Sequence, residues 1–97
     1  MLLFFPTKRE THMRGVVIHV EHRIGWIAIR DHHDEITIAE ILGGYNVERD
    51  HVIIGNLHSL GGGVFFNQTT NKSMHVMVEY IRLTARQSIA AIQRRRR

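Results

Sequence analysis

Short apolar runs recur along the chain at intervals of about ten residues, and glycine, asparagine and aspartate separate them. Apolar and polar positions alternate most regularly over 35–41 and 74–80, which is typical of half-buried strands. The runs at 16–20, 24–30, 51–57 and 64–67 are rich in residues that favour strands. The pattern predicts a mainly β fold, a small antiparallel barrel of five or six strands over about residues 13–80.

The last part of the chain has a different period. Ile81, Leu83, Ala85, Ile89 and Ile92 recur at mostly helical spacing, with arginine and glutamine off that stripe. We expect a C-terminal α-helix over about residues 81–93, packed on the barrel or on a second copy of the chain. The arginines at 94–97 would then form a basic tail, and residues 1–97 a single domain.

The strand expected at 35–41 has two distinct faces. Its alternation places Ile36 and Ile38 towards the core and Thr37 and Ala39 on the other face. We therefore expect the face of the sheet that carries Ile36 and Ile38 to be buried.

The segment RGVVIHV at 14–20, followed by GWIAI at 25–29, resembles the opening of cold-shock-type OB-fold domains. Those domains begin with a basic residue, a glycine and an apolar strand, then continue with a glycine, an aromatic residue and a second apolar strand. The resemblance covers about residues 14–30. It implies an OB-like barrel that binds single-stranded nucleic acid on the face of its second and third strands.

The resemblance also assigns places to individual residues. Trp26 stands at the first aromatic of the glycine–aromatic motif, and His19 at the place of an aromatic on the first strand. Ala28 stands where the family has a second aromatic, and residues 36–39 lack the aromatic and the histidine of its third strand. The resemblance thus implies the family's fold with most of its stacking surface missing.

The composition narrows the class of protein. With 97 residues, 43% of them hydrophobic and 23% charged, the chain has the size and balance of one globular domain. The absence of cysteine excludes disulfides, thiolate metal sites and a cysteine nucleophile. No apolar run approaches the roughly 20 residues of a membrane-spanning helix. Met1–Phe5 precedes Lys8 and Arg9 instead of following a basic region, unlike a secretory signal. We expect a soluble, cytoplasmic protein with no membrane partner.

Charge is divided unevenly along the chain. Residues 81–97 contain six arginines and no acid, whereas residues 1–80 contain seven basic and nine acidic side chains. A cationic end attracts polyanions without reading their sequence, although a terminal charge run is equally typical of a solvated end. If the protein binds nucleic acid, we expect the terminal arginines to supply most of the affinity.

One strand face combines an aromatic with a basic side chain. If Ile27 and Ile29 point inward, Trp26, Ala28 and Arg30 all point outward. An exposed tryptophan beside an arginine suits base stacking and cation–π contact, and burial against the C-terminal helix is the alternative. The candidate nucleic-acid contacts are His19, Trp26, Arg30, Arg82, Arg86, Arg94, Arg95, Arg96 and Arg97.

The eight histidines are the unusual feature of the composition. Histidine binds zinc, copper and nickel, and the densest group is the DHHD turn at 31–34. Adjacent strand residues point apart, however, and no two histidines stand four residues apart, the spacing of a metal-binding pair on a helix. We therefore expect no cofactor and no specific metal that holds the fold together. No serine, acid or histidine stands in a recognisable catalytic arrangement, so we do not expect an enzyme.

Three functions stay open at this point, the last of them a histidine-rich metal binder. The first is a non-catalytic OB-like module that binds single-stranded nucleic acid through a small aromatic and histidine face and a basic C-terminus. The second is a protein-interaction or homo-oligomeric assembly module that uses the same barrel face or the C-terminal helix. The acidic balance of residues 1–80 favours the second, and the arginine-rich end favours the first.

Overall fold

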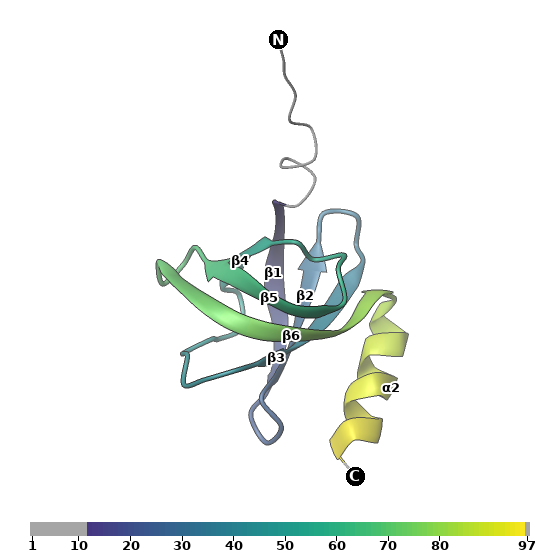
Figure 1. Cartoon of the computed structure of the whole chain (residues 1–97). Coiled ribbons are helices and arrows are strands. Elements are labelled where there is room, and N and C mark those ends of the chain that lie inside the picture. Colours follow the sequence, from purple (N-terminus) through teal and green to yellow (C-terminus); the bar gives the residue numbers. More distant parts are fainter. Residues whose placement is uncertain (1–11, 97) are drawn as a thin grey trace.

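The computed structural model describes residues 12–96 as six strands and one helix (Figure 1). The strands are β1 (Met13–Glu21), β2 (Trp26–Asp31), β3 (Ile36–Ile41), β4 (Val52–Gly55), β5 (Gly61–Asn67) and β6 (Lys72–Leu83), and the helix is α2 (Ala85–Arg96). All neighbouring strands are antiparallel, and they close in the order β1-β2-β3-β6-β5-β4. The prediction of a mainly β antiparallel barrel with a C-terminal helix is confirmed.

The interior of the barrel is filled by side chains that alternate along each strand. Ile27 and Ile29 of β2 belong to this core, as do Met74 and Val76 of β6. Phe65 of β5 lies among them and is 1% exposed. Closure of the barrel pairs both edges of every strand, which protects so small a sheet from pairing with other chains.

A second apolar layer lies outside the barrel, between α2 and the outer faces of β2 and β3. It contains Trp26, Ala28, Ile36, Ile38, Ala91 and Ile92. Strands β2 and β3 are therefore buried on both faces, which explains why their apolar runs are nearly continuous. Figure 1 shows α2 lying along the outside of the barrel, directly after β6.

The two faces of β3 are the reverse of those predicted. Ala39 packs in the barrel core, and Thr37 Oγ1 donates a hydrogen bond of 2.6 Å to the carbonyl of Leu57, another core residue. Ile36 and Ile38 lie outside the barrel, beneath α2. The alternation predicts the period of the strand correctly, but it cannot assign the faces because the helix buries the outer one as well.

The helix begins later than predicted and continues through the arginines. Ile81 and Leu83 belong to β6, where Leu83 pairs with β3. Thr84 caps the helix: its Oγ1 accepts a hydrogen bond of 3.2 Å from the N–H of Gln87, and its own N–H donates to Gln87 Oε1 at 2.9 Å. This reciprocal capping box fixes the start of the helix. The arginines at 94–96 form its last turn instead of a separate tail.

Strand β5 includes Gly61–Gly63, although the sequence predicts that these glycines separate two strands. These glycines pair with β6, so the sheet continues across them. On the neighbouring β4, Gly55 lies against the ring of Phe65, and a Cβ at Gly55 would stand 2.5 Å from Phe65 Cδ1. The ring fills the barrel because this position has no side chain.

The OB-like resemblance stays a prediction, since a closed six-stranded barrel does not by itself identify a cold-shock domain. The predictions for Met1–Phe5 and Arg97 concern residues outside the described range. Among residues 12–96, no helix has both the length and the apolar character needed to cross a membrane.

Candidate nucleic-acid interface

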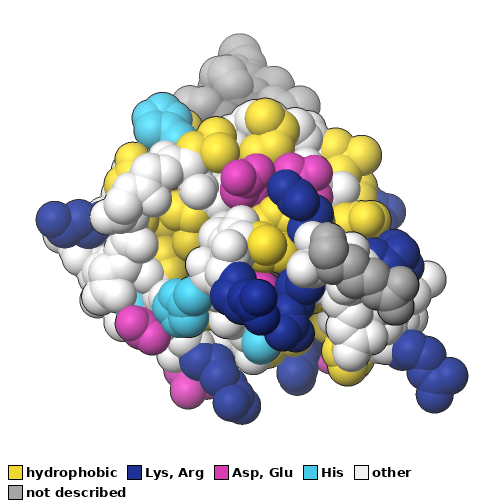
Figure 2. Space-filling view, turned by 90° about the horizontal axis from the view of Figure 1, so that it is seen from below, with side chains coloured by type: hydrophobic (Ala, Val, Ile, Leu, Met, Phe, Trp, Pro, Cys, Tyr) yellow, Lys and Arg dark blue, Asp and Glu magenta, His cyan; other side chains and the backbone are white. Residues whose placement is uncertain are grey.

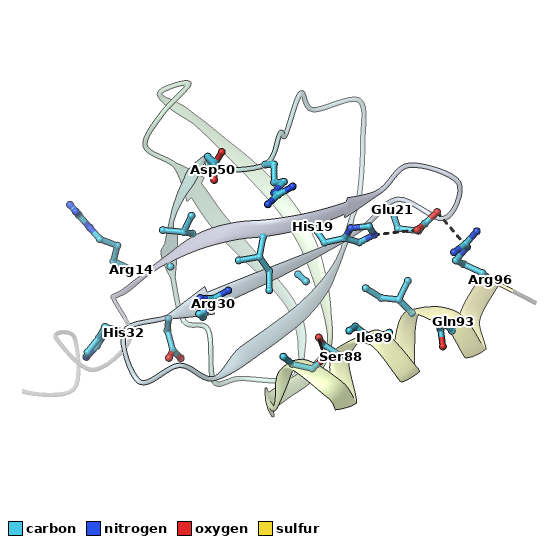
Figure 3. A pocket seen from close by; sticks show the side chains of 18 residues that line it. Arg14, His19, Glu21, Arg30, His32, Asp50, Ser88, Ile89, Gln93 and Arg96 are labelled. Carbon is cyan, nitrogen blue, oxygen red and sulfur yellow. Dashed lines mark hydrogen bonds and ion pairs between the residues drawn. The ribbon is translucent and has the colours of Figure 1, made fainter.

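A groove of about 840 Å³ lies between α2 and the outer faces of β1 and β2 (Figure 3). Its lining comes from both strands, from the turn after β2, from the connection between β3 and β4, and from α2. The lining residues are Arg14, Gly15, Val16, Ile18, His19, Glu21, Ala28, Arg30, Asp31, His32, Arg49, Asp50, Ala85, Ser88, Ile89, Ile92, Gln93 and Arg96. The groove thus combines four arginines with apolar side chains from a strand and a helix.

A β-bulge in β1 turns two neighbouring side chains towards the groove. Val17 pairs with Ile29 and His19 pairs with Ala28, so Ile18 is the extra residue on β1. Val17 stays in the barrel core, while Ile18 and His19 both line the groove. Strict alternation would have placed His19 on the inner side with Val17, so the bulge is what makes this histidine available to a ligand.

The floor of the groove is apolar and partly open to solvent. Val16 of β1 is 38% exposed and Ile89 of α2 is 56% exposed, although both are large apolar side chains. Ile18 and Ile92 also line the groove and pack into the layer beneath α2. Exposed apolar surface inside a concave site is typical of a place where a ligand binds.

Basic side chains stand at both ends of the groove. Figure 3 shows Arg14, Arg30 and His32 towards one end and His19 and Arg96 towards the other. Figure 2, which views the molecule from below, shows basic and histidine side chains gathered among exposed hydrophobic ones. An elongated anion that lies along the groove would therefore meet positive charge at each end.

The acidic residues of the lining offset these arginines only in part. The Glu21 side chain is 11% exposed, and its carboxylate lies 3.6 Å from Arg96 Nε and 3.3 Å from His19 Nε2. Asp31 also lines the groove, but its side chain is only 1% exposed. Asp50 is the exposed acid of the lining. A ligand in the groove would therefore meet fewer carboxylates than the lining contains.

Three of the predicted contact residues, His19, Arg30 and Arg96, come together in the groove. Trp26 does lie on the outer side of β2, but it is not exposed as the stacking interpretation requires. It is 4% exposed beneath α2, where Tyr80 meets its ring edge-on and the Arg95 guanidinium lies 5.8 Å from the ring centroid. Burial against the helix, the alternative interpretation, is what the structure shows.

The other predicted arginines lie elsewhere. Arg82, Arg86, Arg94 and Arg95 are exposed but do not line the groove, and Arg97 lies outside the described residues. The C-terminal charge is therefore spread around α2, and only a part of it faces the groove.

The sequence analysis missed the lining residues Arg14, His32 and Arg49. Alternation along β1 could have placed Arg14 on the outer face. No local pattern could have placed Arg49, because two backbone hydrogen bonds between distant segments bring its loop to β1. The N–H of Asp50 donates to the Val17 carbonyl at 2.8 Å, and the N–H of Val17 donates to the His51 carbonyl at 2.9 Å.

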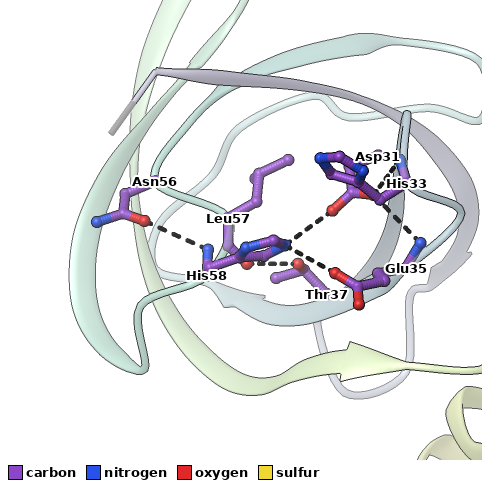
Figure 4. A network of polar contacts seen from close by, with 7 residues as sticks. All are labelled: Asp31, His33, Glu35, Thr37, Asn56, Leu57 and His58. Atoms are coloured by element: carbon purple, nitrogen blue, oxygen red, sulfur yellow. Dashed lines mark hydrogen bonds and ion pairs between the residues drawn. The ribbon is translucent and has the colours of Figure 1, made fainter. Parts of the chain in front are cut away.

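A polar network closes the mouth of the barrel near the groove (Figure 4). Asp31 Oδ1 accepts hydrogen bonds from the N–H groups of His33 at 2.8 Å and Glu35 at 3.1 Å, and Asp31 Oδ2 lies 2.9 Å from His58 Nε2. Burial acts to raise the pKa of the Asp31 carboxyl, but these donors outweigh burial and hold the pKa below its ordinary value. Among the described residues, Asp31, Glu35 and His58 are the group that could hold a metal ion.

The chain matches no protein-family model, no curated protein and no solved structure. Its function has to follow from its own residues and their geometry.

Proposed function

We propose that this protein is a non-catalytic module that binds single-stranded nucleic acid in the groove beside α2. The observation that carries the proposal is the combination of Arg14, Arg30, Arg49 and Arg96 with an exposed apolar floor. Single-stranded nucleic acid has the matching chemistry, because it presents phosphates together with unpaired bases. A duplex keeps its bases stacked inside, so only its phosphates could contact the groove, through the arginines.

Histidine and guanidinium planes supply the stacking surfaces in this proposal. The His19 side chain is 51% exposed and His32 is exposed as well. Unpaired bases stack on histidine and arginine planes as they do on larger aromatic rings. Because the groove offers no exposed tryptophan, phenylalanine or tyrosine among the described residues, we expect modest affinity and little preference for base sequence.

The test follows the anisotropy of a fluorescein-labelled single-stranded oligonucleotide at low salt. The variant Arg14→Gln with Arg30→Gln removes two exposed cations from the groove and leaves both apolar cores intact. We expect the affinity to fall at least roughly tenfold, because a hydrogen bond to a charged group contributes about 1.5 kcal/mol or more.

The matched control removes the same charge from outside the groove. Arg86→Gln with Arg94→Gln takes two exposed arginines from α2, neither of which lines the groove. The proposal expects this pair to bind almost as well as the wild type. An equal loss in the two variants would indicate attraction by total charge, and no binding at low salt would remove the nucleic-acid function.

A protein-interaction role is the second candidate, favoured by apolar side chains at and before β5. Leu60 and Val64 are 60% and 56% exposed, and both lie outside the groove lining. Light scattering after size-exclusion chromatography would detect self-association through this surface. If the chains associate there, Val64→Ser should lower the measured molar mass towards that of a single chain. The variant that lacks Arg14 and Arg30 should keep the molar mass of the wild type.

A further inference from the structure

Three side chains with metal-ligating atoms converge at the mouth of the barrel (Figure 4). Asp31 ends β2, Glu35 follows the next turn, and His58 comes from the connection between β4 and β5. One ligand atom from each of them lies within 4.8 Å of the other two. Because His58 is distant in sequence from the two acids, no spacing motif reveals this group.

The Asp31 carboxylate is oriented so that one oxygen is held and the other faces its neighbours. Its Oδ1 accepts two backbone hydrogen bonds, from His33 at 2.8 Å and from Glu35 at 3.1 Å. Its Oδ2 faces His58, and the side chain is 1% exposed. Metal-ligating carboxylates are commonly oriented by outer hydrogen bonds of this kind.

The distances between the ligand atoms fit a shared ion. His58 Nε2 lies 2.9 Å from Asp31 Oδ2 and 3.3 Å from Glu35 Oε1. Zinc bonds of about 2.0–2.2 Å to nitrogen and oxygen place neighbouring ligand atoms roughly 3.0–3.5 Å apart. Small side-chain adjustments would therefore be enough to seat an ion among the three atoms.

Charge and access also suit a divalent cation. A protonated His58 brings one positive charge to two carboxylates, whereas a divalent cation balances both of them. The side chains of His58 and Glu35 are 17% and 38% exposed, so an ion can enter from solvent and keep a bound water. One imidazole nitrogen and two carboxylate oxygens are ligands that zinc accepts.

We propose that Asp31, Glu35 and His58 form a zinc site in which water completes the coordination. The site ties the turn between β2 and β3 to the connection between β4 and β5. It shares only Asp31 with the groove lining, and that side chain is 1% exposed, whereas Glu35 and His58 lie outside the lining. Zinc binding can therefore be tested apart from the proposed nucleic-acid function through Glu35 and His58. Both apolar cores are complete without the ion, so zinc adds stability to a barrel that folds in its absence.

The experiment titrates zinc chloride into the metal-free full-length chain by isothermal calorimetry. We expect one saturable site per chain, and a higher melting temperature when zinc is present because the ion binds only the folded protein. Glu35→Gln and His58→Ala each remove a ligand and should weaken the affinity roughly tenfold or more. The control is His22→Ala, which removes an exposed histidine that belongs neither to the groove lining nor to the three ligands and should bind zinc as the wild type does.

Cobalt(II) gives a second readout, since its visible absorption responds to nitrogen and oxygen ligation and should disappear in the His58 variant. If His58→Ala does not fold by circular dichroism, Glu35→Gln decides, because it keeps the size of the side chain. The site is refuted if the wild type shows no saturable binding. It is also refuted if Glu35→Gln and the wild type bind zinc equally, which would assign the binding to surface histidines.

Discussion

Asp31 is a buried carboxylate that the fold surrounds with hydrogen-bond donors. Its side chain is 1% exposed and receives hydrogen bonds from the N–H groups of His33 and Glu35 and from His58. We predict that Asp31→Asn lowers the free energy of unfolding by about 1.5–3 kcal/mol, the range for hydrogen bonds to a charged group. Urea unfolding followed by tryptophan fluorescence measures this. Asp34→Asn is the control, because the Asp34 side chain is 86% exposed and its surface ion pair contributes little.

The same carboxylate predicts how stability depends on pH in metal-free buffer. The pKa of Asp31 is lowered in the folded protein because its donors outweigh burial. A carboxyl with a lowered folded pKa stabilises the fold above its unfolded pKa, and this contribution is lost as the pH falls through the folded pKa. The unfolding free energies of the wild type and Asp31→Asn should therefore converge on acidification. A difference that stays constant at every pH would contradict this.

Trp26 illustrates what alternation can and cannot predict for one residue. It correctly places the indole on the outer side of β2, but exposure depends on what covers that side. Ala91 and Ile92 of α2 cover it, and this contact joins residues far apart in the sequence. His19 shows the opposite case, because a bulge that no local pattern indicates turns it outward.

At the scale of elements, Gly55 of β4 leaves room for the ring of Phe65 on β5. A Cβ at this position would stand 2.5 Å from Phe65 Cδ1, and Phe65 is 1% exposed in the barrel core. We predict that Gly55→Ala destabilises the protein by about 1–3 kcal/mol, the usual effect of adding a methyl group to a filled core. Thermal unfolding measures the change. Gly44→Ala is the control, since no atom lies within 4 Å of a Cβ there.

The helix α2 depends on its capping box for a defined start. Thr84→Ala removes the hydroxyl that accepts a hydrogen bond from the N–H of Gln87. We predict that the free energy of unfolding falls by about 1 kcal/mol. Trp26 lies beneath the last turns of α2, so thermal unfolding followed by circular dichroism is the measurement for the first turn. Thr84→Ser keeps a hydroxyl and should behave as the wild type. Equal stability of all three proteins would mean that tertiary contacts alone set the helix start.

The boundary between β6 and α2 shows why element type was easier to predict than element ends. Ile81 and Leu83 are two residues apart, which fits a strand, and with the later apolar residues they also fit a helical stripe. Pairing of Leu83 with β3 decides for the strand. The TARQ sequence at 84–87 has the form of a capping box, so the correct start could have been predicted from local residues alone.

At the scale of the whole molecule, β2 and β3 separate two apolar cores, one inside the barrel and one beneath α2. The alternation along the strands predicts the first core. The second depends on where the helix docks, and the groove depends on the same docking because α2 forms one of its walls. The fold class could therefore be predicted from the sequence, whereas the candidate site could be predicted only in part.

The position of α2 also changes which arginines should contribute to binding. The charge of residues 81–97 predicts a dominant contribution from the C-terminal run, but among its described members only Arg96 lines the groove. We predict that neutralising Arg14, Arg30 and Arg96 together reduces the slope of log affinity against log salt by about two units. This follows from about 0.7 units for each phosphate contact with a single strand.

The comparison variant neutralises Arg86, Arg94 and Arg95, which removes the same charge from the surface of α2 outside the groove. Its slope should fall by much less, because these side chains do not lie where the strand would run. Oligonucleotide anisotropy across a salt series gives both slopes. If the two variants lose equal amounts, binding is diffuse attraction to a basic helix. If the salt slope falls only in the groove variant, the arginines act as a binding site because the docking of α2 on β2 and β3 brings Arg96 to the same groove as Arg14 and Arg30.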